Sequence, residues 1–297
     1  MSRSALFALL LIVTAGRAAA EPAVLATIKP VHSLVASVMM GAGTPELLIG
    51  GALSEHSFAL KPSDARKIER ARLVFEIGPD LETYLIAPLA VLASHADVVV
   101  LERAPGVHLL PARRGGLWED TAAAGPSDPH LWLDPQNAIA MTRAISAALS
   151  RSDPAHRRLY EANAARTIAA LGALERELAA RLTPLAGRHY LVFHDAYRYF
   201  ETRFGLTPAG AVMVAPDRPV GPRRIETLRA AIAGGSIACV FREPQFSPRL
   251  VETLVEGSRV PVGVLDPLGA DLAPGPGLYP TLLRNLGHSI VDCLNRR

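Results

Sequence analysis

The sequence predicts an α/β protein in which two parallel-sheet lobes are joined by a single long rigid helix. Short apolar runs alternate with amphipathic segments in both halves of the chain, a rhythm typical of parallel strands connected by helices. Between the halves, residues 154–182 keep a helical composition with no proline after Pro154. A helix of that length spans roughly 43 Å at 1.5 Å per residue, more than one small lobe needs. We therefore expect it to connect the two lobes.

The first 20 residues are expected to be a signal peptide that is removed on export. Arg3 supplies a positive charge, Leu6 to Val13 form an apolar stretch, and Ala18 to Ala20 fit the small-residue cleavage pattern. The apolar stretch is too short to cross a bilayer of about 30 Å. No cysteine lies near the cleavage point, so a lipid anchor is not expected. The sequence thus indicates a periplasmic protein.

The charge balance excludes an electrostatic nucleic-acid binder. The chain has 31 basic and 28 acidic residues, and removal of Arg3 and Arg17 with the leader leaves 29 against 28, a net charge of +1. No basic block is interleaved with aromatic residues, the pattern that nucleic-acid binding surfaces show. We expect a monomer without a nucleic-acid partner.

The N-terminal lobe is expected to cover residues 21–150. Its buried strands are predicted at residues 24–28, 46–49, 73–77 and 98–101, with helices at 31–40, 62–71 and 80–94. Residues 103–127 lack any periodicity and are rich in glycine and proline, which predicts a long irregular loop. Helical spacing resumes after Pro135 and runs to about Ser150.

The connecting helix is assigned to residues 151–183 and the C-terminal lobe to residues 184–297. Ser152-Asp153-Pro154 is a typical helix start, because proline suits the first helical position. In the second lobe, strands are predicted at residues 189–193, 209–214, 237–242 and 262–265, with helices at 195–204, 222–233, 247–257 and 279–294.

The two cysteines, Cys239 and Cys293, favour one structural disulfide. An even number of cysteines in an exported chain is typical of such a bond. A thiolate metal site is the rival interpretation, but the two cysteines are too far apart in the sequence for a metal-binding knuckle.

Three histidines and one aspartate form the candidate metal site, His56, His130, His194 and Asp266. They lie 74, 64 and 72 residues apart, so only the whole fold could gather them. His194 and Asp266 each follow a predicted strand directly, and His56 lies in the loop after another. Ligands bind at the carboxyl ends of parallel strands. Each lobe contributes two candidates, so we expect a transition-metal site in the cleft between the lobes.

Five motifs around these residues resemble those of the metal-binding periplasmic components of ABC importers, most closely the zinc-specific ZnuA-type branch. The resemblance covers the mature chain in order. The motifs are Ser-Glu-His-Ser-Phe at 54–58, Leu-Lys-Pro-Ser-Asp at 60–64, Asp-Pro-His-Leu-Trp-Leu-Asp-Pro at 128–135, Phe-His-Asp-Ala-Tyr at 193–197 and Leu-Asp-Pro-Leu-Gly at 265–269.

The resemblance implies a non-enzymatic protein that captures Zn(II) and delivers it to an ABC permease. It implies that the three histidines are ligands, with Asp266, Glu55 or a water completing the shell, and that Cys239 and Cys293 form the disulfide of the zinc branch. Family members carry a tract of histidines and acids where this chain has only His108, Glu119 and Asp120 in residues 103–127. A metal-collecting role of that loop is therefore not expected here.

Three other functions compete with zinc capture. A manganese or iron carrier of the same fold is the first, but three imidazoles favour zinc over manganese, which prefers oxygen ligands. An exported zinc metallohydrolase is the second, with Glu55 as a general base, but the sequence has no His-Glu-x-x-His helix. An adhesin of the same fold is the third, which metal binding alone would not distinguish from a carrier.

Overall fold

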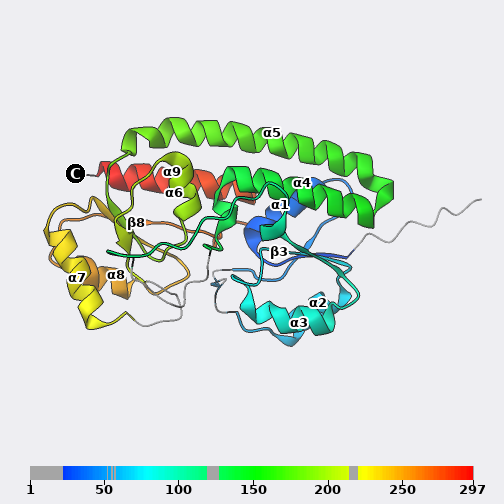
Figure 1. Cartoon of the computed structure of the whole chain (residues 1–297), viewed down its shortest axis with the longest axis horizontal. Helices are drawn as coiled ribbons and strands as arrows, with labels where there is room; N and C mark the ends of the chain where they lie inside the picture. The colour runs from blue at the N-terminus through cyan, green and yellow to red at the C-terminus, as the bar shows by residue number, and fades with distance from the viewer. Residues whose placement is uncertain are drawn as a thin grey trace, which may run out of the picture.

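Two four-stranded parallel sheets lie side by side beneath a layer of long helices (Figure 1). This computed structural model describes residues 23–51, 53–54, 56, 58–118, 127–213 and 220–296. The predicted signal peptide, residues 1–20, lies outside these ranges, as do Glu55, Glu119 and Asp120. None of the described helices is both long and apolar enough to cross a membrane.

The first sheet has the strand order β2-β1-β3-β4, with every pair parallel. Its strands are β1 (Val24–Ala26), β2 (Glu46–Leu47), β3 (Leu73–Glu76) and β4 (Asp97–Val100). The helices that connect them are α1 (Lys29–Met39), α2 (Pro62–Arg70) and α3 (Ile86–Leu92). Proline begins or nearly begins α1 and α2, where its missing N–H costs no hydrogen bond.

The second sheet repeats this order as β6-β5-β7-β8, again with every pair parallel. Its strands are β5 (Tyr190–Val192), β6 (Gly210–Ala211), β7 (Cys239–Arg242) and β8 (Val262–Val264). The helices of this lobe are α6 (Arg198–Phe204), α7 (Pro222–Ala233) and α8 (Arg249–Val255). The predicted fold class is confirmed: two parallel α/β lobes are present.

The predicted long helix that joins the lobes is confirmed, and a second long helix runs beside it (Figure 1). The predicted connector is α5 (Arg157–Leu182), flanked by 3₁₀ turns at Pro154–His156 and Thr183–Leu185. Helix α9 (Leu278–Asn295) runs beside α5 and contacts both α1 of the first lobe and β8 of the second (Figure 1). The sequence identified α9 as a helix, but nothing in its periodicity indicated that it crosses between the lobes.

The hydrophobic core is continuous from one lobe to the other. Helix α1 is buried on all sides between its sheet and helices α4 (Pro135–Ser152), α5 and α9. One cluster of buried side chains includes residues from both sheets and all four of these helices, and a smaller cluster lies within the second lobe. Trp132, with no exposed surface, is among the largest side chains in the shared core.

Three predicted helices are clearly shorter than expected, and one of them is α8, which was predicted over residues 247–257 and covers Arg249–Val255. The segment predicted as a helix over residues 80–94 has a 3₁₀ turn at Thr83–Leu85 before α3 begins at Ile86. Pro88 cannot donate the backbone hydrogen bond that would extend the α-helix back through Tyr84. Helix α6 begins at Arg198 rather than at residue 195.

The predicted disulfide between Cys239 and Cys293 is confirmed. It joins the first residue of β7 to α9, with the two Cα atoms 6.0 Å apart. Both cysteines are buried. A bond that closes a loop of this size stabilises the fold by about 4 kcal/mol in the chain-entropy model. It also attaches α9 to the sheet of the second lobe.

Candidate metal centre

The structure brings His56, His130 and His194 together between the lobes. One ligand atom from each residue lies within 4.8 Å of the other two, and no other group of three potential ligands does so in the described part of the chain. His130 and His194 are 3% and 2% exposed, whereas His56 is half-buried.

His130 is oriented by the motif that contains it. Asp128 Oδ1 accepts hydrogen bonds from the backbone N–H of His130, at 2.9 Å, and from its Nδ1, at 2.8 Å. The Trp132 indole donates to Pro267 O at 2.9 Å. Asp134 caps α4, and its two carboxylate oxygens accept hydrogen bonds from Nε and Nη2 of Arg203, on α6 of the other lobe, each at 2.8 Å. This motif therefore presents His130 and also joins the lobes.

His194 lies two residues beyond the carboxyl end of β5. Its Nδ1 lies 2.8 Å from both oxygens of Glu243, a buried carboxylate that follows β7 directly and also accepts a hydrogen bond from the Tyr197 hydroxyl at 3.0 Å. A carboxylate on Nδ1 fixes the ring so that Nε2 carries the lone pair. His130 and His194 thus share the same arrangement. In each ring, Nδ1 is hydrogen-bonded to a carboxylate, and the two Nε2 atoms face each other.

His56 lies in the loop after β2, where its backbone N–H donates to the Ser54 hydroxyl at 3.2 Å. Its Nε2 is 3.1 Å from Nε2 of His130, and Nε2 of His194 is 3.4 Å from the same atom. Two nitrogens bound to one tetrahedral zinc ion at about 2.0–2.1 Å are separated by roughly 3.3 Å. The spacing of these nitrogens therefore fits a single ion.

Burial keeps the imidazoles of His56 and His130 neutral. It lowers the pKa of His56 well below its usual value, and the neighbouring His130 and His194 lower it further. The pKa of His130 is lowered well below the usual range by burial and by His194. Burial raises the pKa of Asp128 to about 7, against the opposing hydrogen bond from His130. Neutral imidazole is the form that binds metals, so these donors need lose no proton at pH 7.

Asp266 is not a member of the three-residue group. Its Oδ1 accepts hydrogen bonds from Gln245 Nε2, at 2.8 Å, and from the backbone N–H groups of Leu268 and Gly269, while Oδ2 accepts from Ala270 N–H at 2.6 Å. In this arrangement the carboxylate organises the turn that follows β8. Binding an ion would require Asp266 to exchange some of these hydrogen bonds.

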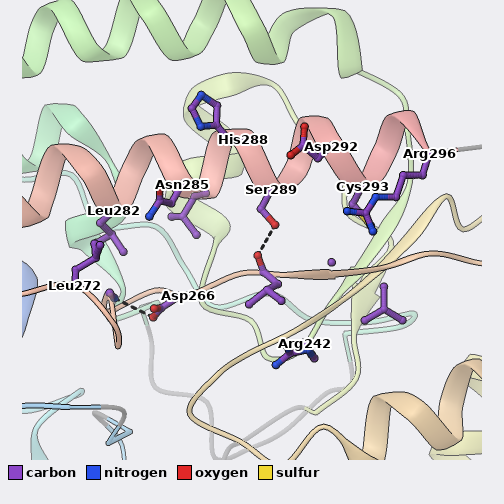
Figure 2. Close-up of a pocket in the computed structure, with 15 residues that line it drawn as sticks. Arg242, Asp266, Leu272, Leu282, Asn285, His288, Ser289, Asp292, Cys293 and Arg296 are labelled. Carbon is purple, nitrogen blue, oxygen red and sulfur yellow. Dashed lines mark hydrogen bonds between the residues drawn. The ribbon is translucent and has the colours of Figure 1, made fainter.

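A cavity of about 650 Å³ lies on the side of Asp266 where β8 faces α9 (Figure 2). Its walls include Arg242, Asp266 and Asp292, and Ser289 of α9 donates to the carbonyl of Val264 across it. None of the three histidines lines this cavity. The cavity and the histidine cluster are therefore separate features of the structure.

Glu243 is not among the site residues predicted from the sequence. The residue directly follows β7, the same position at a strand's carboxyl end that drew attention to Asp266. Its position after a strand could therefore have identified it as a candidate. However, Glu243 precedes a proline and lies outside the recognised motifs, so nothing else in the sequence indicates a role at the site.

We expect Glu243→Ala to weaken zinc binding by about 10- to 100-fold, because loss of an outer-shell partner frees the ligand ring and its tautomer. Competition with a chromophoric chelator measures the affinity. Glu252→Ala, an exposed acid on α8, is the matched control. Equal affinities in the two variants would show that Glu243 does not orient His194.

Comparisons with known proteins agree with this architecture. The family model of the periplasmic zinc-uptake complex component A (ZnuA) matches residues 24–293. The high-affinity zinc uptake system protein ZnuA of Brucella suis is 43% identical over 306 residues, covering 92% of each chain, and that of Paracoccus denitrificans is 35% identical, again with 92% of each covered.

A solved structure shows the same fold. The periplasmic zinc-binding protein TroA from Treponema pallidum superposes with a TM-score of 0.81 at 22% identity, over 93% of this chain and all of the other. The family model spans residues 24–293, and the relatives with 43% and 35% identity each match 92% of this chain. The chain therefore belongs to the ZnuA family of periplasmic zinc-uptake components.

Proposed function

We propose that this protein captures Zn(II) in the periplasm and delivers it to an ABC-type permease. The observation that carries the proposal is the convergence of three Nε2 atoms from two lobes at distances suited to one zinc ion. Its relatives named as zinc uptake proteins support the same role. The mature chain would begin after residue 20, act as a monomer and have no nucleic-acid partner. Residues 21–150 and 184–297 would form the lobes and residues 151–183 the connector.

His56, His130 and His194 are the proposed protein ligands. The fourth position is taken by Asp266, by Glu55 or by water. Asp266 would have to leave its backbone donors to reach the ion, whereas a water would need no rearrangement of the described residues. In each case the ion is cargo and not a catalyst, so the protein is proposed not to be an enzyme.

Zinc is preferred because the ligand atoms are nitrogen. Three neutral imidazoles suit zinc, whereas manganese binds oxygen-rich sites and gains little from them. The carboxylates Asp128 and Glu243 are engaged with Nδ1 atoms of His130 and His194, which leaves the cleft dominated by nitrogen donors. This favours the zinc carrier over the manganese or iron carrier.

Calorimetric titration of the chelator-stripped mature protein with zinc and with manganese tests the proposal. We expect one zinc ion per chain and at least roughly 100-fold weaker manganese binding, as the ligand types predict. Absence of zinc binding would overturn the proposal, and a preference for manganese would favour the alternative carrier. Turnover in a hydrolase screen of the zinc-loaded protein would instead favour a metallohydrolase.

A further inference from the structure

Residues 107–118, called the strap here, run from the first lobe to the second. The strap is part of the region predicted as an irregular loop, yet its start is tightly held. Asn137 of α4 accepts a hydrogen bond from His108 N–H at 2.8 Å and donates its own Nδ2 to His108 O at 3.1 Å. The strap therefore leaves the first lobe from a fixed point next to the segment that carries His130.

The middle of the strap contacts the residue that orients His130. Leu110 N–H donates to the Tyr199 hydroxyl at 3.0 Å, and that hydroxyl donates to Asp128 O at 2.8 Å. Asp128 N–H donates in turn to Leu110 O at 2.8 Å. Since Tyr199 belongs to α6 of the second lobe, this triangle of hydrogen bonds fastens Asp128 and the strap to the opposite lobe.

Arg113 of the strap connects to the segment that carries His194. One guanidinium nitrogen lies 2.8 Å from Asp195, the residue after His194, and 2.7 Å from Glu201 of α6. The Arg113 side chain is only 16% exposed, and Trp118 covers it with its ring centroid at 4.3 Å. Glu201 is fully buried and accepts a hydrogen bond from the Tyr190 hydroxyl. A buried ion pair of this kind tolerates little displacement, because unpaired buried charge is costly.

The far end of the strap adds to the edge of the second sheet. Leu117 forms a parallel bridge with Gly210 of β6, and its carbonyl accepts hydrogen bonds from Ala211 N–H and from the Arg224 guanidinium. A Cβ on Gly210 would lie 2.3 Å from Leu117 Cβ and 2.5 Å from its carbonyl oxygen. Only glycine at position 210 lets the strap lie this close.

We propose that the strap is an interlobe clasp that holds His130 and His194 in register before the metal arrives, with Arg113 as its positioning residue. The inference rests on the proposed zinc capture and adds to it a determinant of affinity. The strap touches Asp128, which orients His130, and Asp195, which adjoins His194, so its loss lets the two ligands drift apart. Ligands that are already held in position bind the zinc ion more tightly, because less conformational entropy is lost when the ion binds.

Arg113→Met is the direct test, and Arg114→Met, which removes the same charge from the exposed next residue, is the matched control. We expect the zinc dissociation constant to rise by about 10- to 100-fold in Arg113→Met, the range typical of lost outer-shell support. In Arg114→Met it stays within about twofold of wild type. Chelator competition measures both.

A double variant separates positioning from general stability. Arg113→Met leaves the Glu201 carboxyl buried without its cation, and adding Glu201→Gln replaces it with a neutral amide that needs no cation. We expect the double variant to regain most of the lost thermal stability while its zinc affinity remains low. If the double variant recovered both its thermal stability and its zinc affinity, Arg113 would act only through stability. That result would overturn its assignment as a positioning residue.

Gly210→Ala tests the clasp without changing any charge. The added methyl displaces Leu117, so zinc affinity should fall as in Arg113→Met. Gly221→Ala, at a glycine with open space around its Cβ position and an ordinary φ of −76°, serves as the control. Wild-type zinc affinity in both Arg113→Met and Gly210→Ala would overturn the clasp and leave zinc capture intact. A wild-type protein that bound no zinc would overturn the proposed function itself.

Discussion

His194→Ala should weaken zinc binding by on the order of a thousandfold. The substitution removes one of three nitrogen donors and also leaves Glu243, which is 1% exposed, without its histidine partner. Loss of an outer-shell partner alone costs 10- to 100-fold, so removal of the ligand itself should cost more. Calorimetry in the presence of a competing chelator measures the change.

His95→Ala is the control for this experiment, because His95 is an exposed histidine of the first lobe outside the cluster. Its zinc affinity should match wild type. A His194→Ala protein that is folded by circular dichroism and binds zinc within threefold of wild type would remove His194 from the ligand set. The same comparison with His56→Ala and His130→Ala tests the other two ligands.

Lys29→Met should destabilise the protein by about 2–5 kcal/mol. The Lys29 ammonium lies in the interior and donates hydrogen bonds to three backbone carbonyls, those of Gly269 at 2.8 Å, Ala270 at 2.6 Å and Leu272 at 3.0 Å. Each buried acceptor that loses its donor costs about 1–3 kcal/mol. The bonds to Gly269 and Ala270 are buried and the third is partly buried, while removal of the ammonium relieves its own desolvation cost and offsets part of the loss. Urea unfolding of the metal-free protein measures the loss.

Lys67→Met is the matched control, since Lys67 donates to one carbonyl, that of Leu47, from a side chain that is 30% exposed. We expect a loss below about 1 kcal/mol there, typical of a single partly exposed hydrogen bond. Equal losses in the two variants would mean that Lys29 does not hold the turn after Asp266. That turn carries a proposed ligand, so its anchoring bears on whether Asp266 can move toward the ion.

The fold and the histidine cluster could be predicted because both follow from local rules. Strand–helix alternation gave the two parallel sheets, and His194 and Asp266 were found as residues following strands. The long helix was recognised from composition and from Pro154. Each of these patterns can be recognised within a short stretch of sequence. In a parallel sheet the carboxyl ends of the strands lie at one edge, so residues that follow different strands come close together.

The supporting contacts could not be predicted, for a physical reason. Glu243 meets His194, and Lys29 meets the turn after Asp266, through hydrogen bonds between residues 49 and about 240 positions apart. Hydrophobic periodicity carries no information about such pairs. The sequence of the strap predicts an irregular loop, because Pro111, Gly115 and Gly116 break every period. Side chains of the other lobe nevertheless hold it in place.

The three histidines come from three separate loops, while the sheets, α5 and α9 contribute none of them. An exchange of one donor atom for another therefore falls on a loop and leaves the strands and the long helices unchanged. We therefore expect that the metal preference of this fold can change by substitution of a ligand in one loop, while the two sheets and the long helices keep their structure.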